Sequence, residues 1–420
     1  MFTRIQTRSF RCLKAVDQSL GRFRALVGPN ASGKTTFLDV IGFLGDLMRS
    51  RGDVLGTTRS RSTNFENLLW KNEGESFQLA LEANIPESIR ARMGENKQHF
   101  TYVRYEIDIG FDKADNEIGI NHETLWLLKP GEGESIQYRF SFPEIRSTVT
   151  TILLKSGKNR NAAITKKPGG NDNYYAHGKK DTYTPSFKLG RGKSALANLP
   201  ADEENFPVSA WFRNLLDQGV QPFILNSQAI HLPSPPGKGR RFQTDGSNLA
   251  WVIADLRKNA KQFNLWLSHV RTALGDINDI DTIERPEDKH RYIVLRYFNG
   301  AEVPSWLVSD GTLRLLALTI PAYLTDLEGT FLIEEPENGI HPRAIEAILQ
   351  SLSSVYSGQV LIATHSVIAL NMLDPHQILC FGKDETGATD IVAGDLHPVL
   401  KDWKKGEPDL GVLFASGILS

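Results

Sequence analysis

The segment GPNASGKT at residues 28–35 is the feature of this sequence that most restricts its fold. It matches G-x-x-x-x-G-K-[ST], a pattern in which glycines let successive backbone N–H groups turn toward phosphate oxygens. The apolar run Phe23–Val27 before it predicts a buried strand, and Thr36–Leu47 after it predicts a helix with apolar residues at helical spacing. A strand, a glycine loop and a helix in this order favour an α/β fold that binds phosphate at a helix N-terminus.

The residues of this loop are the candidate ligands of a nucleoside triphosphate. Lys34 is expected to reach the β- and γ-phosphates. The Thr35 hydroxyl is expected to bind Mg²⁺, which accepts few protein oxygens and keeps its other positions for phosphates and water. The other candidate nucleotide-binding residues here are Gly28, Pro29, Asn30, Ala31, Ser32, Gly33 and Thr36. The expected cofactors are therefore ATP and Mg²⁺; the alternative is a glycine turn with no ligand.

Two adjacent carboxylates, Glu334 and Glu335, follow a second apolar strand expected at Thr330–Ile333. Neighbouring residues on a strand point to opposite sides. One acid can therefore face the magnesium ion while the other polarises an attacking water. We assign Glu334 to the metal and Glu335 to the general base. The alternative is a pair of acids that only caps a solvated helix.

Two further segments complete the set. SDGTLRLLAL predicts a helix with Ser309 as its N-cap, so that its N–H groups face an anion, and Pro321 should end or kink it. A third apolar strand over Val360–Thr364 leads into His365, whose ring can hydrogen-bond a phosphate oxygen. Taken alone, a serine-capped helix or a histidine at a strand end more often has no functional role. Their order and spacing along the chain make the four segments informative together, and together they predict an ATPase.

The four segments resemble those of the ABC-type ATPases of the SMC, RecF and OLD-like group. The resemblance implies an α/β fold: an ABC-type P-loop ATPase head with a mainly parallel nucleotide-binding sheet, an antiparallel β-lobe and a helical or insertion subdomain. In this group two copies close around ATP, so Ser309 and Gly311 would act on the nucleotide held by the other copy. By position, Glu334 matches the Walker B acid, Glu335 the catalytic glutamate and His365 the switch histidine. Glutamate at 334, where many relatives have aspartate, lengthens the arm to the metal.

The resemblance extends to three further elements of the group. Glu337–Gly339 correspond to the D-loop. Arg11 lies where relatives place an N-F-R element near the nucleotide, although an exposed strand arginine is the alternative. The Q-loop glutamine stays unassigned, because neither the Asn64–Trp70 region nor Gln78, which lies in a strand pattern, matches it.

The rest of the chain divides into four expected parts. Residues 1–150 are expected to hold the P-loop and an antiparallel β-lobe, 151–245 a flexible basic insertion, 246–290 a helical subdomain, and 291–420 the remainder of the head. Alternating apolar residues predict the strands of the lobe at Phe77–Leu81, Val103–Ile109, Trp126–Leu128 and Tyr138–Phe142. A helical stretch is expected at Asn248–Leu274, a hairpin over Arg291–Val308, and an apolar tail at Trp403–Leu419 that docks on the head or on a partner.

Two interpretations of the basic insertion stay open. Between residues 155 and 193 there are ten Lys and Arg against two Asp. Such a loop can neutralise the phosphates of a nucleic acid, with Tyr174, Tyr175 and Tyr183 stacking on bases. Alternatively, it is a solvated loop. A second basic group, at residues 238–241, precedes the helical stretch. Nucleic acid is therefore a candidate partner through 155–193 and 238–241.

The composition restricts the setting of the protein. The 48 Lys and Arg balance 49 Asp and Glu, so affinity for nucleic acid must come from a local patch. Cys12 and Cys380 are too few for a disulfide framework. With neither a signal peptide nor an apolar run of about 18 residues, a cytoplasmic protein without a membrane span is expected.

The motifs predict an ATPase, and the resemblance implies that it forms a homodimer around two Mg·ATP and switches a separate effector. The resemblance to ATPase subunits of bacterial anti-phage defence systems implies that this effector is a nuclease. The 55 residues after His365 are expected to be too few for the nuclease domain of OLD-like enzymes. The alternative is a RecF-like, ATP-gated DNA clamp in DNA repair. The energy subunit of a transporter is disfavoured, because the signature segment here is SDGT rather than the Ser-Gly-Gly-Gln usual in transporter ATPases, and because the Q-loop is unassigned.

Overall fold

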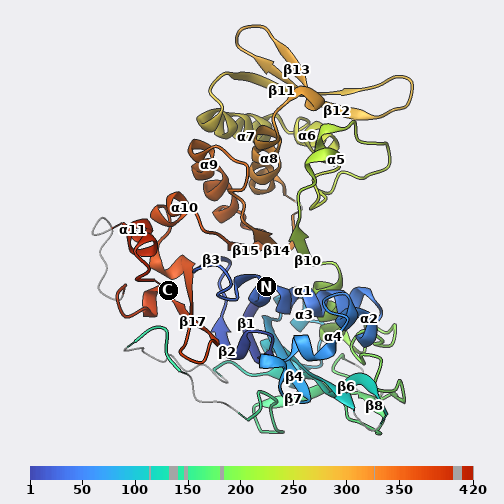
Figure 1. Ribbon diagram of the computed structural model, residues 1–420. Coiled ribbons are helices and arrows are strands. Elements are labelled where there is room, and N and C mark those ends of the chain that lie inside the picture. Colours follow the sequence, from blue (N-terminus) through green and yellow to red (C-terminus); the bar gives the residue numbers. More distant parts are fainter. Residues whose placement is uncertain are drawn as a thin grey trace.

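Three β-sheets organise the computed structural model (Figure 1), which describes residues 1–112, 115–131, 141–145, 150–179, 184–325, 327–400 and 409–419. The largest sheet has the strand order β2-β1-β4-β5-β6-β7-β8-β9, the second β10-β14-β15-β3-β16-β17, and the third β11-β12-β13. In Figure 1 the six-stranded sheet lies between the eight-stranded sheet and a helical region that carries the three-stranded sheet. The expected α/β head with a nucleotide sheet and an antiparallel lobe is confirmed.

The six-stranded sheet brings the motifs together. Its strands are β10 (Val220–Phe223), β14 (Gly329–Glu334), β15 (Gly358–Ala363), β3 (Phe23–Val27), β16 (Ile378–Lys383) and β17 (Thr389–Ala393). All neighbours pair in parallel except β16 and β17. Glu334 is in register with Ala363, and Ala363 with Leu26. Because parallel strands end at one edge of a sheet, the P-loop, the paired acids and His365 all follow strands at that edge.

The eight-stranded sheet is antiparallel throughout. Its strands are β1 (Phe2–Phe10), β2 (Leu13–Ser19), β4 (Ser76–Asn84), β5 (Tyr102–Asp112), β6 (Glu117–Leu128), β7 (Arg160–Lys166), β8 (Asp172–Tyr174) and β9 (Ser186–Phe187). The three strands predicted around Phe77, Val103 and Trp126 correspond to β4, β5 and β6. Of the fourth, predicted at Tyr138–Phe142, residues 138–140 lie outside the described residues, and residues 141 and 142 form a bend.

Part of the expected flexible insertion belongs to this sheet, which corrects the sequence analysis. Strand β7 pairs with β6, and β8 pairs with β7. The Lys166 ammonium and the Asp172 carboxylate, both buried, are 2.6 Å apart. Tyr174, expected to stack on bases, is fully buried and donates a hydrogen bond to the Ala195 carbonyl oxygen at 3.0 Å. A count of basic residues overestimates the free positive charge of this segment, because the buried Asp172 carboxylate neutralises Lys166. Tyr183 lies outside the described residues.

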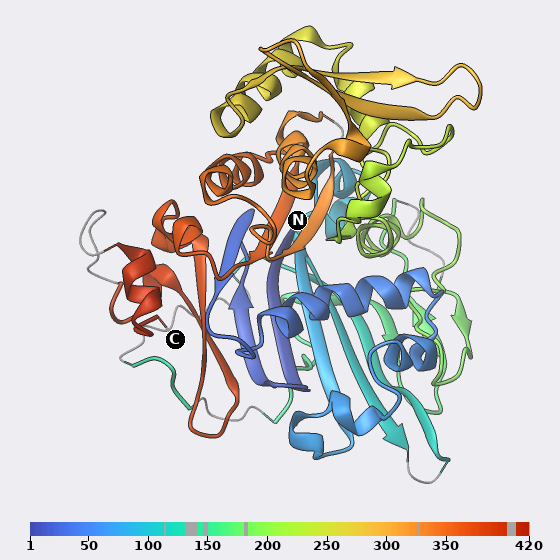
Figure 2. The same ribbon diagram turned by 45° about the horizontal axis from the view of Figure 1, so that its top comes forward.

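Helix α1 (Lys34–Arg49) packs across the eight-stranded sheet (Figure 2). The ring centroid of Phe77 lies 5.0 Å from that of Phe10 and 5.8 Å from that of Phe43, so aromatic side chains join β1, β4 and α1. The other helices of this half are α2 (Val54–Arg59), α3 (Glu87–Arg90) and α4 (Pro207–Asp217). The core between helix and sheet fixes the direction of α1, whose N-terminus carries Lys34 and Thr35.

A second core forms between the six-stranded sheet and the helical region. Its helices are α5 (Ser227–His231), α6 (Leu249–Leu256), α7 (Ala260–Ala273), α8 (Asp310–Thr319) and α9 (Pro342–Ser353). The three-stranded sheet consists of β11 (Ile277–Glu284), β12 (Arg291–Tyr297) and β13 (Glu302–Pro304). The helix expected at Asn248–Leu274 is two helices, α6 and α7. Helix α8 ends before Pro321, as predicted, and Trp266 Nε1 donates to Thr319 Oγ1 at 3.0 Å.

The last elements pack beside the switch histidine. Helix α10 (Val367–Asn371) begins two residues after His365, and α11 (Leu410–Ala415) packs on it. The Gly411 N–H donates to Asn371 Oδ1 at 2.7 Å. Residues 403–408 of the predicted tail lie outside the described residues. None of the helices in the described ranges combines the length and the apolar character that a bilayer crossing requires.

Candidate nucleotide-binding site

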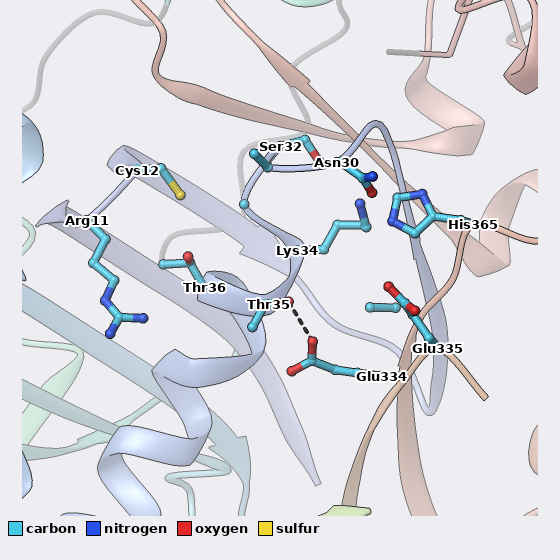
Figure 3. A pocket seen from close by; sticks show the side chains of 13 residues that line it. Arg11, Cys12, Asn30, Ser32, Lys34, Thr35, Thr36, Glu334, Glu335 and His365 are labelled. Carbon is cyan, nitrogen blue, oxygen red and sulfur yellow. Dashed lines mark hydrogen bonds between the residues drawn. The ribbon is translucent and has the colours of Figure 1, made fainter. Parts of the chain in front are cut away.

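A pocket of about 430 Å³ opens where β3, β14 and β15 end (Figure 3). Its lining residues are Arg11, Cys12, Asn30, Ala31, Ser32, Gly33, Lys34, Thr35, Thr36, Glu334, Glu335, Ala363 and His365. Three motifs far apart in the sequence thus share one cavity. Figure 3 shows Lys34, Glu335 and His365 on one side of it and Arg11 on the other.

Two glycines of the loop have no space for a side chain. A Cβ at Gly28 would lie 2.3 Å from the Phe381 carbonyl oxygen, and one at Gly33 would lie 2.4 Å from Thr389 Oγ1. Gly33 also has φ +105°, which disfavours other residues. Thr389 Oγ1 donates to the Ser32 carbonyl oxygen at 2.8 Å. The loop is therefore held against β16 and β17 by close backbone contacts.

Lys34 closes the loop from within. Its Nζ donates to the carbonyl oxygens of Gly28 and Pro29, each at 2.8 Å. Burial lowers the pKa of Lys34 to about 8, although Glu335 and Glu334 act in the opposite direction. The ammonium is therefore mostly protonated at neutral pH, as the binding of a phosphate requires.

Thr35 and Glu334 lie side by side from two different elements. Thr35 Oγ1, at the start of α1, donates to Glu334 Oε2, at the end of β14, over 2.6 Å (Figure 3). A hydroxyl and a carboxylate are oxygen donors that Mg²⁺ accepts, and both face the pocket. The side chain of Glu334, longer than the aspartate that many relatives have at this position, reaches the Thr35 hydroxyl. These two residues therefore fit a magnesium ion carried by a nucleotide.

Glu335 is turned by its backbone, which corrects one step of the sequence analysis. Strand β14 ends at Glu334, so strand alternation does not separate the two acids. Instead, Glu335 has φ +45°, a strained conformation for this residue type, and its N–H donates to the Ala363 carbonyl oxygen at 2.7 Å. Asn338 Nδ2 donates to Glu335 Oε2. Backbone strain and an amide donor together orient this carboxylate.

Glu337 anchors the backbone at His365, a contact that the sequence analysis missed. Its Oε1 accepts hydrogen bonds from Thr364 Oγ1 and from the His365 N–H, both at 2.8 Å. Burial and then the Lys34 ammonium lower the pKa of His365, so its ring is neutral at pH 7. The signal for Glu337 in the sequence was its position two residues after Glu335. The loop after β14 thereby fixes the end of β15.

Arg11 and Cys12 form the far wall of the pocket. Arg11 has φ +50° and its guanidinium lies 3.4 Å from Asp39 Oδ2. Cys12 was not expected here; its Sγ would lie 3.0 Å from a Cβ at Gly33. Both residues occupy the turn between β1 and β2, which places the eight-stranded sheet beside the P-loop.

Four predicted residues lie apart from the lining that the described residues form: Gly28, Pro29, Ser309 and Gly311. Ser309 caps α8, with Oγ accepting from the Thr312 N–H at 3.3 Å, and a Cβ at Gly311 would lie 2.6 Å from the Gly339 carbonyl oxygen. Gln78, which the sequence did not assign to the Q-loop, lies in the eight-stranded sheet, where its Nε2 donates to Asp108 Oδ2 at 2.8 Å.

Comparisons with known proteins agree with this geometry. Residues 23–371 match the family described as "AAA domain, putative AbiEii toxin, Type IV TA system". The chain belongs to this family. It is also 49% identical over 51 residues to the OLD nuclease of Thermus scotoductus (strain ATCC 700910 / SA-01), a match over 12% of this chain and 10% of that protein.

Two solved SMC head structures are similar to this chain over most of its length. The crystal structure of the SmcHead bound to the C-winged helix domain of ScpA has a TM-score of 0.50 at 13% identity, covering 93% of this chain and 96% of that chain. The Smc head domain with an extended coiled coil, bound to the C-terminal domain of ScpA derived from Pyrococcus furiosus, gives 0.49 at 12% identity, with 93% and 95% covered. The family match and the partial match to the OLD nuclease support an ABC-type ATPase of the SMC, RecF and OLD-like group, and the SmcHead structure shows its fold.

Proposed function

We propose that two copies of this chain bind two Mg·ATP at a shared interface, hydrolyse the ATP and use the cycle to switch a separate partner protein. The observation that carries this proposal is the shared pocket of Lys34, the Thr35–Glu334 pair, Glu335 and His365. Phosphoryl transfer depends on positioning and on charge stabilisation rather than on covalent chemistry by the protein. In this proposal these side chains position the phosphates and the attacking water and stabilise the negative charge.

Each residue then has one task. Lys34 stabilises negative charge on the phosphates, and Mg²⁺, when bound, supplies further positive charge there. Thr35 and Glu334 would hold that ion. Glu335, fixed by its backbone and by Asn338, orients and polarises the attacking water. His365, whose backbone N–H is held by Glu337, contacts the γ-phosphate.

Action in trans accounts for the position of Ser309 and Gly311. Both lie at the start of α8, a ten-residue helix whose N-terminal N–H groups favour an anion, and apart from the pocket lining of their own chain. A second copy can bring this helix N-terminus to the triphosphate.

The partner that this cycle switches is proposed to be a nuclease in bacterial anti-phage defence, acting in the cytoplasm. The family description names a toxin of a toxin–antitoxin system, and the partial relative is a nuclease. The chain matches only a tenth of that relative, and in this proposal a separate partner cuts the nucleic acid. Isolation of the protein with a bound nuclease subunit would support this assignment.

The main test is Glu335→Gln, which keeps the shape of the side chain and removes the base. Turnover should fall on the order of 10²–10⁴-fold, the usual worth of a general base, while ATP stays bound and the dimer accumulates. Steady-state ATPase assays and light scattering with ATP measure the two effects. Glu346→Gln, at an exposed acid on α9, is the matched control. Normal turnover in Glu335→Gln would refute the assignment.

A second candidate is the RecF-like DNA clamp, favoured by exposed lysines of the 155–193 segment. Those that the structure describes as exposed are Lys155, Lys158, Lys167, Lys179, Lys188 and Lys193. A clamp would lose DNA affinity, and the dependence of that affinity on salt, when Lys155, Lys158 and Lys167 are replaced by glutamine. DNA binding titrated at several salt concentrations separates the two functions. Unchanged binding in this variant would argue against the clamp.

A further inference from the structure

His231 joins two parts of the segment that contains Ser309. Its Nδ1 lies 2.8 Å from the Ser305 carbonyl oxygen and its Nε2 lies 2.6 Å from Asp310 Oδ1. Ser305 Oγ returns a hydrogen bond to the His231 carbonyl oxygen at 2.9 Å. The last residue of α5 is therefore connected to both sides of Ser309, the N-cap of α8.

The two contacts of His231 lie on opposite edges of its ring. Nδ1 faces a carbonyl oxygen, and Nε2 faces a carboxylate oxygen. The side chains of His231 and Asp310 are 23% and 62% exposed, so the pair adds little to global stability. What the two contacts provide is orientation, because they fix the ring and with it the residues on either side of Ser309.

The position of α5 relates this contact to the nucleotide site. Strand β10 ends at Phe223, which is in register with Ile333, the residue before Glu334, and α5 begins four residues later. On the other side of α8, Gly311 lies against the Gly339 carbonyl oxygen, in the loop that follows the paired acids. The start of α8 is therefore held between two segments that both leave the edge of the sheet carrying Glu334.

We infer that His231 is a positioning residue for the ATPase reaction. It holds Asp310, and with it Ser309, in the orientation that reaches the triphosphate bound by a second copy. This inference rests on the proposed action of Ser309 in trans. It assigns His231 no contact with the nucleotide of its own chain, and this separates it from the residues of the pocket.

The first experiment separates catalysis from ATP binding. His231→Ala should lower kcat on the order of ten- to a hundredfold, as small misplacements of catalytic groups do, with an unchanged Kd for ATP measured on the isolated protomer. His290→Ala is the matched control, because His290 also faces an aspartate, Asp288, at 3.3 Å, but on the β11–β12 loop. A normal kcat in His231→Ala, or a weaker ATP affinity with normal kcat, would overturn the inference.

Two conservative variants test which contact matters. In His231→Gln the amide nitrogen can take the place of Nε2 and keep a donor for Asp310. In His231→Asn it can take the place of Nδ1 and keep a donor for Ser305. If His231 acts through Asp310, the glutamine variant should retain more of kcat than the asparagine variant. The reverse order would overturn the inference, and both variants remain informative if His231→Ala folds poorly.

Mixing experiments show whether the effect is in trans. Equal amounts of His231→Ala and Lys34→Ala proteins should regain activity above either alone, because one site of the mixed dimer combines an intact P-loop with an intact α8. Ser309→Ala mixed with Lys34→Ala tests the proposed function in the same way. If only the Ser309 pair regains activity, His231 does not act through the opposite site and the inference fails. If neither pair does, the arrangement in trans fails and the inference with it.

Discussion

At the residue scale, Lys34 makes ATP binding depend on pH. Burial places its pKa at about 8 in the protein without nucleotide, and bound phosphates raise that pKa because they favour the charged form. The contribution of the ammonium to ATP affinity is therefore complete below pH 8. It declines as the pH rises above 8, since the charged fraction falls roughly tenfold for each further pH unit.

The measurement is the Kd for ATP between pH 7 and 9.5, by calorimetry in buffers of different ionisation enthalpy. Affinity should weaken above pH 8, and binding there should take up protons. Lys34→Arg is the control, since a guanidinium stays charged over this range and its affinity should not follow the same curve. A wild-type affinity that is flat up to pH 9.5 would show that Lys34 is not the group involved.

At the element scale, the loop after β14 is tied to the end of β15 by Glu337. Replacing it by alanine leaves the Thr364 hydroxyl and the His365 N–H without their acceptor, which should cost about 1–3 kcal/mol of unfolding free energy. The kcat should also fall, because His365 loses its anchor. Glu337→Gln keeps an oxygen at this place and should be milder in both respects.

Urea unfolding and steady-state kinetics measure these two effects of Glu337. Glu346→Ala, on the exposed side of α9, should change stability by no more than about 0.5 kcal/mol. Should Glu337→Ala prove as stable and as active as the wild type, the loop and the end of β15 are not coupled in the way that the hydrogen bonds indicate.

The same scale shows what the sequence could and could not predict. The strands before Gly28, Glu334 and His365 were predictable because each is a continuous apolar run that ends in a recognisable motif. Strand β10 was not, because it has four residues and its neighbour β14 lies more than a hundred positions away. The sharp turn at Glu335 has no signal in the sequence, since it arises from the contact of its N–H with Ala363. Local patterns predict elements, whereas their neighbours are set by tertiary packing.

At the scale of the whole molecule, one buried side chain joins the two large sheets. Gln359, at the start of β15, accepts from the Phe2 N–H at 3.1 Å and donates to the carbonyl oxygens of Phe2 and Gly21, each at 2.8 Å. It also accepts from Thr330 Oγ1 at 3.1 Å. Phe2 begins β1 of the eight-stranded sheet, while Gln359 and Thr330 belong to the six-stranded sheet. This amide is therefore one link between the two sheets, and the Thr389 N–H, which donates to the Cys12 carbonyl oxygen at 3.0 Å, is another.

Replacing Gln359 by leucine keeps the volume approximately and removes every one of these bonds. Because the Phe2 N–H, the carbonyl oxygens of Phe2 and Gly21 and the Thr330 hydroxyl each lose this partner, the unfolding free energy should fall by about 3 kcal/mol. The pocket lies at the opposite end of β15, so the Kd for ATP measured well below the melting temperature should stay the same. Gln350→Leu, on the exposed face of α9, is the control for an added leucine. If guanidinium unfolding showed an unchanged midpoint in Gln359→Leu, this amide would contribute nothing to holding the two sheets together.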